Sequence, residues 1–164
     1  MKIPVSPVAL GVGLGVVAIA VAGVFYMQRG AHIELKGAVL KVRTQAMDEN
    51  SSVAVVDFRF ANPADYPFVV REVNVSIVDK DGKTIEGLPV SDLDAGRLFQ
   101  YYPQLGQKYN DTLVMRNKIP ARQSMDRMIV ARFEAPESVI ESRKKLKVQI
   151  VDLDGPTSEL VESK

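Results

Sequence analysis

The sequence lacks cysteine and tryptophan and has one histidine, His32. Without cysteine, the chain cannot form a disulfide scaffold or use a thiol nucleophile, and one imidazole cannot complete a zinc centre. No Gly-x-Ser-x-Gly turn and no glycine-rich phosphate loop follows a predicted strand, and His32 lies beside an apolar segment, away from any serine that would need a base. We therefore predict a protein without catalytic activity, cofactor or resident metal.

The chain also lacks an excess of charge of either sign. Its 164 residues include 21 Lys+Arg and 20 Asp+Glu, a formal net charge of +1. A protein that grips nucleic acid is usually strongly basic, so we predict no nucleic-acid partner. Two acidic pairs, Asp92 with Asp94 and Asp152 with Asp154, could line one end of the domain and bind calcium, but solvated carboxylates are commoner than calcium ligands.

One long apolar run is present, from Val8 to Met27, and it contains no charged residue. About twenty helical residues cross the ~30 Å hydrocarbon core of a bilayer. We therefore predict that residues 1–30 form an uncleaved N-terminal transmembrane helix that contacts membrane lipid through residues 8–27. A cleaved secretory signal that ends at Ala20-Val21-Ala22 and removes residues 1–22 is the alternative.

Small residues recur along this helix at spacings of three and four: Gly11, Gly15, Ala18 and Ala22. This spacing aligns them on one helix face, where a second helix can approach closely. We predict that this face packs against a partner protein or a second copy of the chain. The alternative is that glycine and alanine are simply common in membrane helices.

The distribution of basic residues does not decide the orientation of this predicted helix. Lys2 precedes the apolar run and Arg29 and Lys36 follow it, a count that favours a cytoplasmic domain. Large domains, however, translocate largely regardless of such charges. We predict a single-pass protein whose domain is extracytoplasmic, in a periplasm or at a cell surface.

Residues 31–164 show the alternating hydrophobicity of β-strands. Apolar residues alternate with polar ones in Val73–Ile77 and Leu146–Ile150, and a similar pattern runs through Ser52–Ala61. In Met125–Phe133, Met128 and Val130 fall among the outward positions, which predicts a strand covered on both faces. The fold class we predict is all-β, an immunoglobulin/fibronectin-like β-sandwich behind the N-terminal helix.

The connections of this domain contain turn and helix signals. Asp79-Lys80-Asp81-Gly82 predicts a hairpin turn, and Asp154-Gly155-Pro156 ends the last predicted strand. Two short helices are expected, over Ser91–Gln100 and Pro136–Lys144.

The segment from Val53 to Asn62-Pro63, followed by Pro67, a strand over Val69–Val78 and an Asp-Gly turn, resembles a known family. It is similar to the water-stress and hypersensitive-response (WHy) domain of the late-embryogenesis-abundant proteins of class 2, chiefly around Phe58–Pro67. The resemblance implies an immunoglobulin-like sandwich, often carried behind one membrane helix. The sequence departs from the family in the residues after Pro63, and Asn-Pro is also ordinary turn chemistry after a strand.

The segment from Arg97 to Arg122 combines aromatic and basic residues. It includes four aromatic side chains within eleven residues and five basic residues against one acidic residue. Tyrosine and arginine together favour contact with a partner protein, lipid headgroups or an anionic glycan. The alternative is that Leu113–Ile119 is a strand and that the tyrosines close one end of the sandwich. The candidate partner-binding residues are Phe99, Tyr101, Tyr102, Tyr109, Arg97, Lys108 and Arg116.

Two functions follow from these features. In the first, the protein is a single-pass, membrane-anchored interaction protein that acts by contact. In the second, it is an accessory structural subunit of a larger membrane protein complex, with its helix packed through Gly11, Gly15, Ala18 and Ala22.

Overall fold

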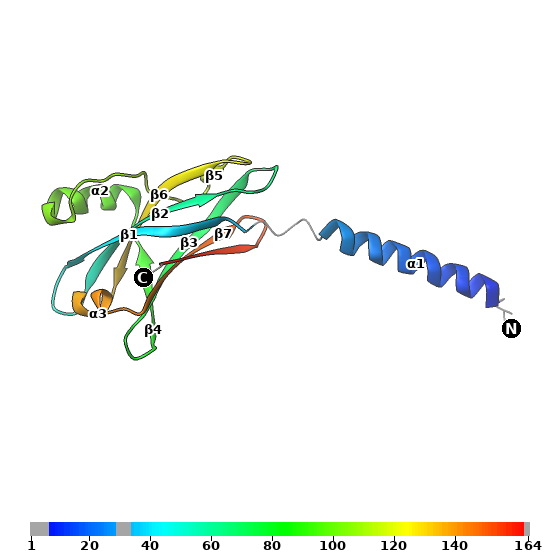
Figure 1. The fold of residues 1–164 in the computed structure, drawn as a ribbon, viewed down its shortest axis with the longest axis horizontal. Helices are drawn as coiled ribbons and strands as arrows, with labels where there is room; N and C mark the ends of the chain where they lie inside the picture. Colours follow the sequence, from blue (N-terminus) through cyan, green and yellow to red (C-terminus); the bar gives the residue numbers. More distant parts are fainter. Residues whose placement is uncertain (1–6, 29–33, 163–164) are drawn as a thin grey trace. The chain divides into compact units, whose positions relative to one another are not determined.

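The computed structural model describes residues 7–28 and 34–162. The chain divides into two compact units, Met1–His32 and Ile33–Lys164. Helix α1 (Pro7–Gln28) belongs to the first unit, and all the strands belong to the second (Figure 1). The predicted boundary between residues 30 and 31, like His32, lies outside the described residues.

Helix α1 begins at Pro7, a residue favoured at the first helical position because its missing N–H has no partner there anyway. In the described part of the chain, no helix is both long enough and apolar enough to span a bilayer. The predicted transmembrane segment over residues 1–30, with its lipid contact through residues 8–27, is therefore not confirmed. Cleavage after Ala22 and the extracytoplasmic location stay predictions.

The second unit is a mostly β domain, as predicted. Its sheet has the order β1-β2-β6-β4-β3-β7-β8, with β5 paired to β3, and every named pair of strands is antiparallel. The strands are β1 (Lys36–Ala46), β2 (Ser52–Ala61), β3 (Phe68–Val78), β4 (Thr84–Pro89), β5 (Lys118–Ile119), β6 (Ser124–Phe133), β7 (Lys145–Asp152) and β8 (Thr157–Val161). The helices of this unit are α2 (Asp92–Tyr101), the one-turn η1 (Pro103–Leu105) and α3 (Glu137–Glu141).

The sheet is nearly closed into a barrel. Because the seven strands of the main path alternate in direction, the first and the last run the same way. Their closing contact is accordingly parallel, a bridge between Val39 of β1 and Glu162 just after β8. Arg143 reinforces this closure, since its Nε donates to the Glu162 carboxylate at 2.8 Å.

The predicted immunoglobulin-like sandwich differs from this arrangement, because the strands do not separate into two sheets. Strand β4 is responsible. Its first part pairs with β3, and Leu88 and Pro89 near its end pair with Arg132 and Ala131 of β6. One strand therefore joins the two halves into one continuous sheet.

Two glycines lie where another group approaches a strand closely. A Cβ atom on Gly87 of β4 would lie 2.6 Å from the Phe133 ring, and one on Gly37 of β1 would lie 2.1 Å from the Arg59 carbonyl oxygen. Both positions therefore exclude a side chain, as is common where another group approaches a strand closely.

Apolar residues of β2 and β6 face both sides of the sheet. Inside the barrel, Phe58, Phe60 and Phe133 are fully buried in the main core. On the outer face, Val53 and Val55 of β2 and Met128 and Val130 of β6 form a second cluster with Ala95 of α2 and Leu105 of η1. The prediction that β6 is covered on both faces is confirmed.

Several predicted local elements are confirmed, and one is wrong. Helix α2 is confirmed with bounds one residue later than predicted, and the Ser91 hydroxyl caps it by accepting from the Asp94 N–H. Gly82 adopts the positive φ of the predicted hairpin turn, and α3 is shorter than expected. Asp154-Gly155-Pro156 does not end the last strand, because it turns the chain from β7 into β8.

The Asn-Pro sequence has a local structural role. The Asn62 side chain is buried, and its Nδ2 donates to the carbonyl oxygens of Tyr66 and, more weakly, Ile119 and Pro120. Its Oδ1 accepts from the Ala64 N–H at 3.0 Å. Asn62 thus joins the β2–β3 connection to the segment that precedes β6.

Candidate interaction surface

Helix α2, η1 and the following residues 106–112 cover the outer face of β2 and β6, and we call this region the α2 surface (Figure 1). It carries most of the candidate residues from the aromatic and basic segment. Two kinds of interaction hold the α2 surface on the sheet. Ala95 and Leu105 are buried in the second apolar cluster, and a polar network joins the segment after α2 to the strands.

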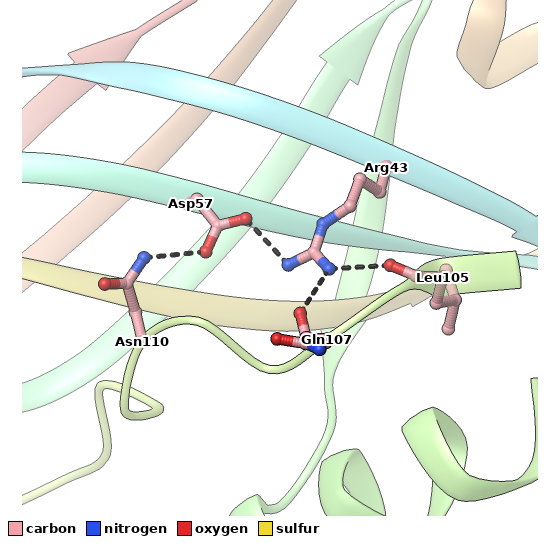
Figure 2. A network of polar contacts seen from close by, with 5 residues as sticks. All are labelled: Arg43, Asp57, Leu105, Gln107 and Asn110. Atoms are coloured by element: carbon pink, nitrogen blue, oxygen red, sulfur yellow. Dashed lines mark hydrogen bonds and ion pairs between the residues drawn. The ribbon is translucent and has the colours of Figure 1, made fainter. Parts of the chain in front are cut away.

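The polar network has the ion pair between Arg43 of β1 and Asp57 of β2 at its centre (Figure 2). The Nη2 of Arg43 lies 2.8 Å from Asp57 Oδ2, and only 10% and 7% of the two side chains are exposed. The Nη1 of Arg43 donates to the carbonyl oxygens of Leu105 at 2.6 Å and Gln107 at 2.8 Å. Asn110 Nδ2 donates to the second carboxylate oxygen of Asp57 at 2.9 Å. Both members of the pair therefore hold the segment from Leu105 to Asn110 on the strands.

Aromatic rings complete the surroundings of Arg43. The centre of its guanidinium lies 5.2 Å from the ring centroid of Phe99 and 5.4 Å from that of Tyr109, distances that suit cation–π contacts. Lys41 Nζ lies 6.0 Å from the same Tyr109 ring. Tyr109, although 64% exposed, is thus placed by two cations of β1.

The other aromatic candidates divide between burial and exposure. Phe99 and Tyr102 are half-buried and pack on the second apolar cluster, so they help to attach α2 to the sheet. Tyr101 is 80% exposed, and its ring packs edge-on against Tyr102 with a centroid distance of 5.2 Å. Tyr101 and Tyr109 are therefore the exposed rings of this surface.

The basic candidates lie in different places. Arg97 pairs with Asp94 on α2, and Lys108 Nζ lies 2.7 Å from Asp92 Oδ1. Arg116 lies apart from them, in the turn before β5, where its backbone has a φ of 68° and its N–H donates to the Val70 carbonyl. Figure 1 shows β5 and α2 at opposite ends of the sheet. The structure thus does not bring Arg116 together with the other six candidates.

The alternative interpretation of Leu113–Ile119 as a strand is correct only for its end. Lys118 and Ile119 form β5, and Thr112 makes an isolated parallel bridge to Met128. The residues between them form a turn.

An ion pair between Asp92 and Lys108 also stabilises the α2 surface. The pKa of the Asp92 carboxyl lies below its usual value, chiefly because Lys108 donates a hydrogen bond to it. The charged carboxylate therefore links the beginning of α2 to the segment after η1.

Beside α2 lies a cavity of about 510 Å³. Three of its nine lining residues, Arg97, Tyr101 and Tyr102, were sequence candidates; the other six, which include Met47 and Arg132, were not. A signal for Arg132 existed, because it continues the outward row of Met128 and Val130 on β6. The lining residues are Met47, Val53, Val90, Asp94, Arg97, Leu98, Tyr101, Tyr102 and Arg132.

Within residues 7–28 and 34–162, no three acidic or histidine side chains gather in a way that would hold a metal ion. Of the acidic pairs noted in the sequence, Asp92 and Asp94 are engaged by Lys108 and Arg97. Asp152 Oδ1 accepts from the Val69 N–H at 3.3 Å.

The predicted packing face of α1 is open in the structure. A Cβ atom added to Gly11 or Gly15 would meet no atom within 4 Å, and Ala18 and Ala22 are exposed. No contact in the structure tests this face, so its partner stays a prediction.

Comparison with known proteins does not assign this chain to a family. No family model matches the chain, and no curated protein matches it. The archaellum periplasmic stator protein FlaG from Sulfolobus acidocaldarius is similar at 12% identity and a TM-score of 0.32, over 77% of this chain and 98% of that one. The Iho670 flagellar-like filament is similar at 12% identity and a TM-score of 0.30, over 96% of this chain and 98% of that one. Such TM-scores do not establish a shared fold, and the resemblance to the WHy domain stays a prediction.

Proposed function

We propose that the protein is a non-catalytic structural subunit of a larger protein assembly, and that α1 packs against helices of other subunits. The observation that carries this proposal is the exposed apolar surface of α1. The large side chains of α1 that the structure describes are between 48% and 75% exposed: Leu14, Val16, Val17, Ile19, Val21 and Val24. Apolar surface gains roughly 25 cal/mol per Å² when it leaves water, so a helix that is apolar on all sides is stable only when covered.

The small-residue face gives this packing a preferred side. Gly11, Gly15, Ala18 and Ala22 lie along one line of α1, and their lack of bulk lets two helix backbones approach closely. Close approach increases van der Waals contact between backbones, which adds to the gain from covering apolar surface.

The β domain would contribute a preformed contact surface to such an assembly. Tyr101 and Tyr109 are exposed, while the buried pair of Arg43 and Asp57 holds their segment against the strands. Exposed tyrosines on an ordered backbone lose little conformational entropy on binding, which favours association.

Size measurement of the full chain in mild detergent, by chromatography with light scattering, tests the proposal. We expect a defined oligomer or a stoichiometric complex. A single chain per micelle at all protein concentrations, with no stoichiometric partner recovered, would contradict it.

Matched substitutions then test the face. The double variant Gly15→Ile and Ala18→Ile adds bulk to the small-residue face and should reduce the assembled fraction several-fold. Gly13→Ile with Ala20→Ile makes the same chemical change on the opposite side of α1 and should leave assembly unchanged. Equal loss in both variants would exclude this face as the contact.

A further inference from the structure

We infer that the cavity beside α2 binds a small amphipathic anion, a molecule with an apolar body and one carboxylate-type head group. This site does not depend on the proposed assembly through α1. The cavity measures about 510 Å³, within the range of roughly 300–1,000 Å³ that is usual for small-molecule sites.

The walls of the cavity are mainly apolar. Val53 of β2 is buried, while Leu98 and Tyr102 of α2 and its C-cap are half-buried. The exposed side of the cavity is formed by Met47, which follows β1 and is 38% exposed, and by Tyr101, which is 80% exposed. A flexible thioether and two aromatic rings suit a flat or extended apolar body.

The charged groups of the lining favour a negative head group. Asp94 is already engaged, because its carboxylate accepts from the Ser91 hydroxyl at 2.8 Å and pairs with Arg97 at 3.1 Å. Arg132 is different: among the described residues, no carboxylate lies within ion-pair distance of its guanidinium. A guanidinium without a carboxylate partner can bind a carboxylate through two parallel hydrogen bonds.

Two other features near Arg132 could compete with the cavity for its charge, the Asp48 carboxylate and a second hollow. The charge of Arg132 acts on the Asp48 carboxylate, but Asp48 is not its ion-pair partner. That carboxylate instead accepts from the Ser51 hydroxyl at 2.6 Å and the Asn50 N–H at 2.8 Å. Arg132 also lines a second hollow, but there Glu86 and Glu134 balance the charges of Lys83 and Arg132, so that hollow has no excess positive charge for an anion. The cavity beside α2 is therefore the site where apolar walls and an available cation meet.

The cavity is also preformed. Ser91 caps α2, and fully buried Ala95 fixes its underside to the sheet. At the other end of the helix, Arg43 holds the Leu105 carbonyl. Binding of a ligand would therefore not carry the conformational entropy cost of ordering α2.

The probe for this site is 2-naphthoate, which has an apolar two-ring body and one carboxylate, and 2-naphthamide is its neutral counterpart. The full chain is kept in solution with amphipol and carries ¹³C-methyl methionine, so that the Met47 methyl group reports on the cavity. Met115, which is 64% exposed and precedes β5, is the internal control. We expect 2-naphthoate to shift the Met47 resonance in a saturable manner while Met115 is unchanged.

Two comparisons separate this proposal from non-specific apolar binding. Arg132→Gln and the use of 2-naphthamide should each weaken binding about tenfold, as expected for loss of a charge-assisted contact. Arg71→Gln removes an exposed arginine of β3, which does not line the cavity, and should leave affinity unchanged. The absence of a Met47 shift, equal shifts at Met115, or equal affinity for acid and amide would overturn the assignment.

Discussion

Arg43 and Asp57 form a buried ion pair across two adjacent strands, with 2.8 Å between Nη2 and Oδ2. They are not direct partners in the β1–β2 register, where Lys41 lies opposite Asp57 and Arg43 opposite Val55. The pair is thus diagonal, and it leaves Nη1 of Arg43 free to donate to the segment that follows α2. Because both charges are withdrawn from water, each depends on the other for compensation.

Replacing Arg43 by methionine should destabilise the domain by about 3–5 kcal/mol, since it leaves the Asp57 carboxylate buried without its cation. The double variant Arg43→Met and Asp57→Leu should recover part of this loss. Arg59→Met is the matched control, because it breaks an Arg–Asp pair with Asp126 in which 62% of the Arg59 side chain is exposed. Its unfolding midpoint in urea should barely change. A small effect of Arg43→Met would show that the network does not hold the α2 surface.

Adding a methyl group to Gly87 should lower stability by about 1–3 kcal/mol, because the new Cβ would press on the Phe133 ring where β4 meets β6. Phe133→Leu should partly rescue Gly87→Ala when the two are combined. Gly96→Ala on α2 is the control, since its Cβ would meet no atom within 4 Å. It should be neutral or stabilising by up to about 1 kcal/mol, through better helix propensity. Thermal unfolding measures all three variants.

The pairing of Asp92 with Lys108 should make part of the stability depend on acid pH. Since the folded-state pKa of Asp92 is lowered, its contribution is fully present above the unfolded value of about 4. It is then lost as the pH falls through the lowered folded value. The difference in unfolding free energy between the wild type and Asp92→Asn should therefore be constant above about pH 5 and shrink below pH 4. A difference that stays constant down to pH 2 would contradict this origin.

Much of the strand pattern could be predicted locally. Val73–Ile77 and Leu146–Ile150 lie in β3 and β7, which pair with each other in register. Met128 and Val130, at positions expected to face outward, correctly indicated that β6 is covered twice. These predictions succeed because side-chain direction alternates strictly along a strand. The order of apolar and polar residues therefore indicates which face of the strand is buried.

The candidate site was predicted only in part. The aromatic and basic composition of residues 97–109 pointed to a segment that lies on the α2 surface, but it could not separate the exposed Tyr101 from the half-buried Phe99 and Tyr102. Met47 and Arg132 reach the same cavity from the β1–β2 turn and from β6. Their proximity to α2 depends on strand pairing between distant segments, which single residues do not encode.

From its residues alone, the chain determined where β2, β3, β6 and β7 lie, where the turn at Gly82 falls, which strand is covered on both faces and where the helices α1 and α2 form. Each of these depends on side-chain periodicity and backbone preference within a few neighbours. Only the tertiary structure decided that β4 joins both halves into one sheet, that β1 meets β8 at Val39 and Glu162, and that Arg43 reaches Leu105. Those contacts join residues far apart in the sequence, and their stability comes from the simultaneous packing of all the strands.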